Sequence, residues 1–227
     1  MATVILVRHG RTTANATGIL AGRAEGVSLD ETGTRQAAHT AERLASVPLA
    51  KIVSSPLERC QQTAQYISDQ QASPSPILTA EDITECDYGA WQGNKLSDLA
   101  VQELWSKVQS TPSAVTFPEG ESMAGMQARA VAEIRRLDAQ VESEHGVQAV
   151  WVAVSHGDII KSVLADALGM HLDLFQRINV GPASVSIIHY GSGAPRVHSV
   201  NTDDGDLSWL APGLTTTDAP VGGGAGN

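Results

Sequence analysis

Short apolar runs alternate along this chain with longer segments of helical periodicity. Strand-sized runs of β-branched and aliphatic residues lie at 3–7, 51–54, 77–79 and 148–154. Helical patterns lie at 30–46, 56–69, 95–109, 122–144 and 158–168. Strands that alternate with helices favour a three-layer α/β/α sandwich around a mainly parallel sheet. Two later strands, at 184–189 and 196–200, flank a Gly-Ser-Gly turn and predict a C-terminal β-hairpin.

Polar residues predict where two of these helices begin. Asp30 precedes the helix at 30–46 and can cap it. Ser55, Pro56 and Glu58 provide an N-cap, a proline at the first helical position and a capping-box glutamate. This start places Arg59 in the first helical turn, just beyond the strand at 51–54.

The 227 residues are enough for one substantial core. We expect a single catalytic domain over residues 1–201, with no internal repeat. Residues 202–227 are acidic and threonine-rich and end in a glycine-rich stretch, which predicts a flexible tail.

Charge and composition narrow the classes of function. The net charge of -10 argues against nucleic acid or an anionic membrane as the main partner. No run approaches the roughly 18 apolar residues of a membrane span. The first residues show no basic segment followed by a long apolar one, so we expect a cytoplasmic protein. Cys60 and Cys86 have no CxxC spacing and predict free thiols.

Chemically capable side chains follow three of the predicted strands. Arg8 and His9 follow the first, Arg59 lies beyond the second, and His156 follows the strand at 148–154. Ligands of such sheets bind at the carboxyl ends of the strands, where we expect these residues to converge. Guanidinium groups match phosphate oxygens, so the cluster predicts a site for a phosphorylated small molecule.

These residue types also suggest a reaction. A neutral histidine can attack phosphorus, and neighbouring arginine charge favours the neutral form. Glu85 is the best-placed carboxyl to protonate a leaving alkoxide, with Asp87 and Asp158 as rivals and a structural ion pair as the other interpretation of Glu85. The sequence has no HExxH or carboxylate-rich ligand spacing, so we expect neither a metal nor another cofactor.

Four motifs carry a family resemblance. They are LVRHGRT at 6–12 with Asn15 after it, SSPLERCQQTA at 54–64, ECDYGAWQG at 85–93 and VSHG at 154–157. In this order they resemble the histidine phosphatase superfamily, in its phosphoglycerate mutase-like branch. The segment PEGES at 118–122 resembles a further family segment that is structural or forms a pocket wall.

The resemblance implies a role for each matching residue. His9 would accept the phosphoryl group, Arg8 and Arg59 would clamp its oxygens, His156 would stabilise the transferring charge, and Glu85 would donate the proton. The expected substrate-binding set adds the following residues to the two arginines: Gly10, Asn15, Gly22, Tyr88 and Gly157. Gly10 and Gly157 would allow close approach of the backbone.

Several alternatives stay open. The resemblance implies that a phosphoglycerate mutase would carry a longer basic insertion between Gln92 and Glu119 to grip the substrate carboxylate. In this chain the segment is short and its only cationic side chains are Lys95 and Lys107, so a phosphatase is favoured over a mutase. Ser155 imitates the nucleophile of a serine hydrolase, and a catalytically inactive module that binds phosphorylated ligands is a third class. A homodimer is compatible with this kind of α/β enzyme.

Overall fold

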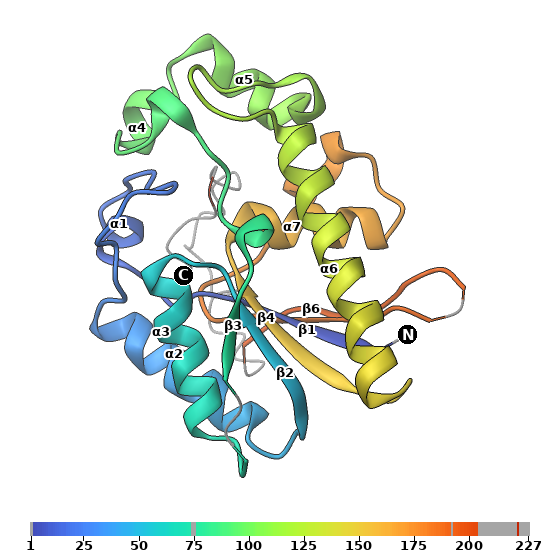
Figure 1. Cartoon of the computed structure of the whole chain (residues 1–227). Helices are drawn as coiled ribbons and strands as arrows, with labels where there is room; N and C mark the ends of the chain where they lie inside the picture. Colours follow the sequence, from blue (N-terminus) through green and yellow to red (C-terminus); the bar gives the residue numbers. More distant parts are fainter. Residues whose placement is uncertain (1, 74–75, 192, 204–221, 223–227) are drawn as a thin grey trace, which may run out of the picture.

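A six-stranded sheet forms the centre of the computed structural model, which describes residues 2–73, 76–191, 193–203 and 222 (Figure 1). The strands are β1 (Thr3–Arg8), β2 (Leu49–Ser54), β3 (Ile77–Thr79), β4 (Val150–Ser155), β5 (Val185–His189) and β6 (Arg196–Thr202). Their order is β3-β2-β4-β1-β5-β6. The first four pair in parallel, and β5 and β6 add an antiparallel hairpin at one edge. The predicted fold class is therefore confirmed.

The central strands are apolar throughout because both of their faces are covered. In β1, Val4 and Leu6 belong to one buried cluster, while Ile5 and Val7 belong to the cluster on the opposite face. Successive side chains of a strand alternate between its faces, so a continuous apolar run marks burial on both sides. Strand β4 repeats this division and pairs with β1 in register from Val150 to Ser155.

Helices cover the two faces in pairs (Figure 1). Helices α2 (Glu31–Leu44) and α3 (Glu58–Asp69) pack on one face, and α6 (Met123–His145) and α7 (Gly157–Ala167) pack on the other. Asp30 caps α2 as predicted, because its side chain accepts a hydrogen bond from the Gly33 amide at 2.7 Å. Figure 1 shows α4 and α5 beyond the end of α6, above the loop that follows β3.

The remaining described elements are short and lie mainly in the connections around the carboxyl ends of the parallel strands. They are α1 (Thr13–Ala16), η1 (Glu81–Ile83), η2 (Gly89–Trp91), α4 (Leu96–Leu99), α5 (Glu103–Ser110), η3 (Pro112–Ala114) and η4 (Leu172–Arg177).

Two predictions of local structure were wrong. The expected helix at 95–109 is divided into α4 and α5, because Gln102 is extended and its side chain accepts a 2.9 Å hydrogen bond from the Trp91 indole. Helix α3 begins at Glu58 with Leu57 at its N-cap and no side-chain cap. The Ser55 hydroxyl is instead 2.7 Å from His156 Nε2, a contact between distant segments that the local pattern does not contain.

Most of the predicted tail falls outside the described residues, namely 204–221 and 223–227. Its first residue, Thr202, ends β6. Among the described residues, no helix has both the length and the apolar character that a membrane crossing requires.

Candidate active site

The structure brings the two histidines and two arginines together at the carboxyl ends of the parallel strands. Arg8 ends β1 and His9 follows it, Arg59 lies in the first turn of α3, and His156 joins β4 to α7. All four are buried, with relative exposures of 1%, 3%, 2% and 0%. The ring centroids of His9 and His156 are 5.3 Å apart.

A backbone contact fixes the tautomer of His9. Its Nδ1 is 2.8 Å from the Gly10 carbonyl, which can only accept, so Nδ1 carries the proton and Nε2 keeps a lone pair. Burial lowers the pKa of His9 well below its usual value, and the charges of Arg59 and then Arg8 lower it further. A neutral imidazole is the form that can attack phosphorus.

Arg59 provides a buried cationic nitrogen that is unsatisfied. Its Nη2 donates to the Gly22 carbonyl at 2.7 Å and lies 3.3 Å from His156 Nδ1. Its Nη1 has no hydrogen-bond partner among the described residues, although it is buried. Buried polar groups are rarely left unpaired, so this atom indicates an anionic ligand.

The guanidinium group of Arg8 is hydrogen-bonded to the loop after η4. Its Nη1 donates to the Val180 carbonyl at 2.9 Å. Burial lowers the pKa of this guanidinium to about 10, against the opposing charges of Glu85 and Asp158. Arg8 therefore stays positively charged at neutral pH.

His156 is locked between two elements. Arg59 can only donate, so His156 Nδ1 accepts and Nε2 holds the proton, which it donates to the Ser55 hydroxyl at 2.7 Å. Burial, followed by the charge of Arg59, lowers the pKa of His156 well below its usual value. Cys60 lies against the same ring, 3.4 Å from Nε2, and burial raises the pKa of its thiol to about 12. The Cys60 thiol is therefore a packing group and not a reactive thiolate.

Glu85 has the properties of a proton donor at neutral pH. Its carboxyl is buried, and Oε1 accepts a 2.9 Å hydrogen bond from the Cys86 amide. Burial, followed by the negative charge of Asp158, raises the pKa of Glu85 to about 7. An acid with a pKa near the working pH is suited to proton transfer in both directions.

A hollow opens in front of these residues. Its described wall consists of His9, Thr12, Asn15, Ile19, Leu20, Ala21, Gly22, Arg59, Glu85, Tyr88, Leu96 and Gly222. Six of the residues singled out from the sequence therefore line it: His9, Asn15, Gly22, Arg59, Glu85 and Tyr88. Gly22 sits at a φ of +53°, and a Cβ there would lie 2.5 Å from the Gln92 side-chain oxygen.

The two other candidate glycines are not in this wall. Gly10 packs against α2, where a Cβ would lie 2.4 Å from the Gly33 carbonyl oxygen, and its amide donates to Thr63 at 3.1 Å. Its small size thus serves contact between loop and helix. Gly157 is the first residue of α7.

Asn15 and Thr12 form one unit at the start of α1. Asn15 Oδ1 accepts hydrogen bonds from the Thr12 hydroxyl at 2.9 Å and from the Thr12 amide at 3.1 Å. Thr12 caps the helix in return through the Asn15 amide. The reciprocal capping fixes both side chains at the wall.

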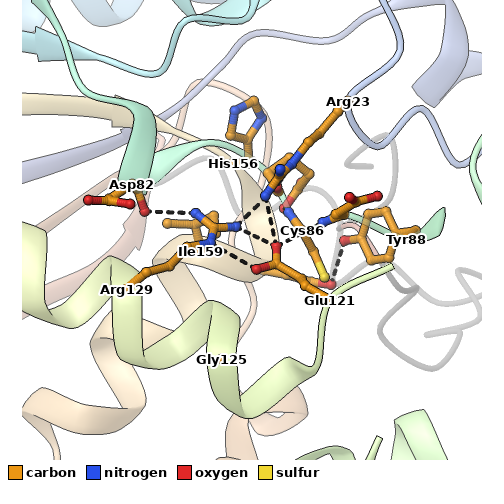
Figure 2. A network of polar contacts seen from close by, with 12 residues as sticks. Arg23, Asp82, Cys86, Tyr88, Glu121, Gly125, Arg129, His156 and Ile159 are labelled. Atoms are coloured by element: carbon orange, nitrogen blue, oxygen red, sulfur yellow. Dashed lines mark hydrogen bonds and ion pairs between the residues drawn. The ribbon is translucent and has the colours of Figure 1, made fainter. Parts of the chain in front are cut away.

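The sequence analysis missed the network that holds the Glu85 loop (Figure 2). Arg23 Nε and Arg129 Nη2 both donate to the Glu85 carbonyl, at 2.8 and 3.2 Å. Glu121 accepts from both of these arginines, at 3.0 and 2.6 Å, and from the Asp87 amide at 2.8 Å. The segment PEGES contains Glu121 and was the available signal, but two of its partners, Arg23 and the Asp87 amide, lie far away in the sequence.

A second buried network lies beside Glu85. Asp158 is fully buried and accepts a 2.8 Å hydrogen bond from the Tyr88 hydroxyl, with Lys161 Nζ 3.5 Å away. The Gly222 amide also donates to Asp158, at 3.0 Å. Asp87, the other rival proton donor, accepts from the Gly89 amide and does not line the hollow. Lys161 gave no signal in the sequence, because it sits in an apolar helical pattern.

Fold and site together define an α/β domain with a buried, cationic, histidine-containing anion site. The model of the histidine phosphatase superfamily (branch 1) matches residues 4–203, and the chain belongs to that family. Among the described residues, no group of three or more His, Cys, Asp or Glu side chains could hold a metal ion.

Individual relatives extend the comparison. A protein of Proteus mirabilis named probable phosphoglycerate mutase GpmB is 32% identical over 193 residues, which cover 84% of this chain and 86% of the relative. The protein of the same name from Yersinia pestis (strain Pestoides F) is 33% identical with the same coverage. Among solved structures, the phosphoserine phosphatase of Entamoeba histolytica in complex with 3-phosphoglyceric acid has a TM-score of 0.79 and 26% identity, covering 90% of this chain and 98% of that one.

Proposed function

We propose that this chain hydrolyses phosphomonoesters of small molecules through a phosphohistidine on His9. The observation that carries the proposal is the pairing of a neutral His9, with its Nε2 lone pair, and the unsatisfied Nη1 of Arg59 in one buried pocket. The other proposed roles are phosphate clamping by Arg8 and charge stabilisation by His156. Asn15, Gly22 and Tyr88 would contact the substrate.

In the first step, His9 Nε2 attacks phosphorus and the bond between phosphorus and the ester oxygen breaks. Glu85 gives its proton to the departing oxygen, so the alcohol leaves neutral and Glu85 becomes a carboxylate. Arg8 and Arg59 balance the negative oxygens of the phosphoryl group during the transfer. The pKa of about 7 leaves a large share of Glu85 protonated at neutral pH.

In the second step, water attacks the phosphohistidine and Glu85 takes a proton from it. The bond between nitrogen and phosphorus breaks, inorganic phosphate leaves, and His9 recovers its lone pair. Both groups return to their starting protonation states, so one molecule of ester and one of water give alcohol and phosphate.

A phosphoglycerate mutase activity is the alternative that the names of the relatives support. A mutase must grip the far end of its substrate while it excludes water. Lys107 faces solvent with a side-chain exposure of 56% and pairs with Glu103, and Lys95 is exposed outside the wall of the hollow. These placements support phosphate ester hydrolysis over a mutase reaction.

One assay separates the two activities. The chain is incubated with 3-phosphoglycerate and a bisphosphoglycerate primer, and separately with a panel of phosphomonoesters. We expect negligible 2-phosphoglycerate and measurable free phosphate from members of the panel. Efficient isomerisation with little phosphate release would establish the mutase, and no turnover at all would favour an inactive binding module.

The serine hydrolase alternative has little support from the geometry. Ser155 Oγ is buried and donates to the Ile83 carbonyl at 2.7 Å, while His156 is engaged with Ser55 and Arg59. Ser155 therefore has no histidine base in this arrangement.

We also infer a reducing, cytoplasmic setting, which is supported by the free and buried thiols of Cys60 and Cys86. A homodimer stays a prediction, which sedimentation at several protein concentrations tests.

A further inference from the structure

The hollow has two chemically different ends. The reactive end holds His9, Arg59 and Glu85. The rest of the described wall contains the polar side chains of Thr12 and Asn15, two glycines, and an apolar set formed by Ile19, Leu20, Ala21, Tyr88 and Leu96.

This apolar wall is built from two segments that are held together by their backbones. The Leu20 amide donates to the Asn94 carbonyl at 2.9 Å, and the Leu96 amide donates to the Gly18 carbonyl at 2.8 Å. Leu20 and Tyr88 also belong to the main buried cluster, and Leu96 packs against it. Three of the five side chains are therefore anchored in or against the core, while Ile19 and Ala21 are half-buried beside them.

Arg11, Arg23 and Lys161 lie outside the described wall of the hollow, and each has a carboxylate partner. Arg23 pairs with Glu121 at 3.0 Å, and Arg11 pairs with Asp30 at 2.8 Å. Lys161 is buried with Asp158, 3.5 Å away. Among the described residues of the wall, Arg59 is the one cationic side chain, and it belongs to the phosphoryl end.

A second anionic group on the substrate would meet an unfavourable environment here. It would leave water for an apolar wall without a cationic partner, which is costly for a charge. Asp158 is hydrogen-bonded to Tyr88 and paired with Lys161, so this neighbouring ion pair offers no free positive charge to a second anion. An uncharged apolar group would instead be stabilised by burial against the same wall.

We propose that the alcohol part of the substrate is uncharged and largely apolar, an aryl or branched alkyl group without a carboxylate. This inference rests on the proposed phosphatase function and adds a substrate class to it. It sets this chain apart from enzymes of phosphoglycerate and phosphoserine, whose substrates carry a carboxylate.

Matched pairs of esters test this assignment. Phenyl phosphate is compared with 4-carboxyphenyl phosphate, and butyl phosphate with 4-phosphooxybutanoate, so that each pair differs mainly by one remote carboxylate. We expect kcat/KM to be at least about tenfold higher for the uncharged member of each pair, as an unpaired charge in the pocket requires. Equal kcat/KM values within both pairs would overturn the substrate class while leaving the phosphatase function intact. If neither member of either pair is hydrolysed, the phosphatase function fails and this inference fails with it.

A substitution that should reverse the preference for uncharged substrates gives a second test. Leu96→Lys places a cation at the apolar wall and should narrow or invert the ratio within each pair. Val101→Lys is the matched control, because Val101 is 86% exposed and lies outside the wall. The same change of ratio in both variants, or in neither, would count against the wall as the determinant of specificity. If Leu96→Lys does not fold, the wild-type ratio alone still decides.

Discussion

Glu85 is the residue whose environment determines the pH range of the proposed reaction. Burial and Asp158 raise its pKa to about 7, and Glu85 must be protonated to assist a poor leaving group. His9 stays neutral well below pH 6.5, because burial and two arginines lower its pKa. We therefore expect kcat/KM for alkyl phosphates to be roughly constant between about pH 6 and pH 7 and to fall as the pH rises further. A steady rise through pH 8 would contradict this assignment.

Replacement of Glu85 separates its chemical role from a structural one. Glu85→Gln should lower kcat for alkyl phosphates by about 10²- to 10⁴-fold. Aryl phosphates should lose less than about tenfold, because their leaving groups hardly need the proton. Asp87→Asn is the control and should change neither rate strongly. Equal losses on both substrate types would point to a structural Glu85.

Arg8, His9 and His156 could be predicted to converge because each ends or directly follows a strand, and Arg59 because it lies in the first turn of the helix after β2. The ends of parallel strands share one edge, so Arg8, His9 and His156 had to be neighbours. Arg23, Arg129 and Glu121 could not be placed in this way, since none of them follows a strand and the contacts of the two arginines with the Glu85 loop and of Arg23 with Glu121 join segments far apart in the chain. The unpaired Nη1 of Arg59 likewise depends on tertiary packing.

The proposed mechanism depends on the loop that carries Glu85, and Glu121 links this loop to Arg23 and Arg129. Glu121→Gln should reduce the free energy of unfolding by about 1 kcal/mol, because two arginines lose a partly buried charge partner. The kcat for alkyl phosphates should fall with it, since the Glu85 carboxyl is no longer positioned. Glu119 lies two residues away and is exposed, so it provides the control. The free energy of unfolding of Glu119→Gln should stay within about 0.5 kcal/mol of the wild-type value. Denaturant unfolding measures both variants, and similar losses in the two would refute the attachment.

Elements were predictable where local pattern and burial agree. Strands β1 and β4 are covered on both faces, so their apolar runs identified them, and the helical spacing identified α6. The segment at 95–109 misled because Gln102 interrupts its helical pattern to bond Trp91. The start of α3 misled because Ser55 contacts His156 and does not cap the helix. In both cases a tertiary contact outweighed a weak local preference.

At the scale of the whole molecule, an acidic chain surrounds one buried cationic pocket. Arg8 and Arg59 supply there the positive charge that Mg²⁺ supplies in many sites of phosphoryl transfer. We therefore expect EDTA to leave kcat and KM unchanged and added Mg²⁺ to have no effect. Loss of activity with EDTA and its recovery with one divalent ion would show that a metal takes part.

The central claim is the phosphohistidine on His9, and trapping it is the most direct measurement. Wild-type protein is mixed with an aryl phosphate, quenched in base during turnover and digested for mass spectrometry. We predict an acid-labile, base-stable phosphate on the peptide that contains His9, also in the His39→Ala control. The His9→Ala protein should show no adduct and almost no turnover. An adduct elsewhere, or substantial turnover by His9→Ala, would contradict the account.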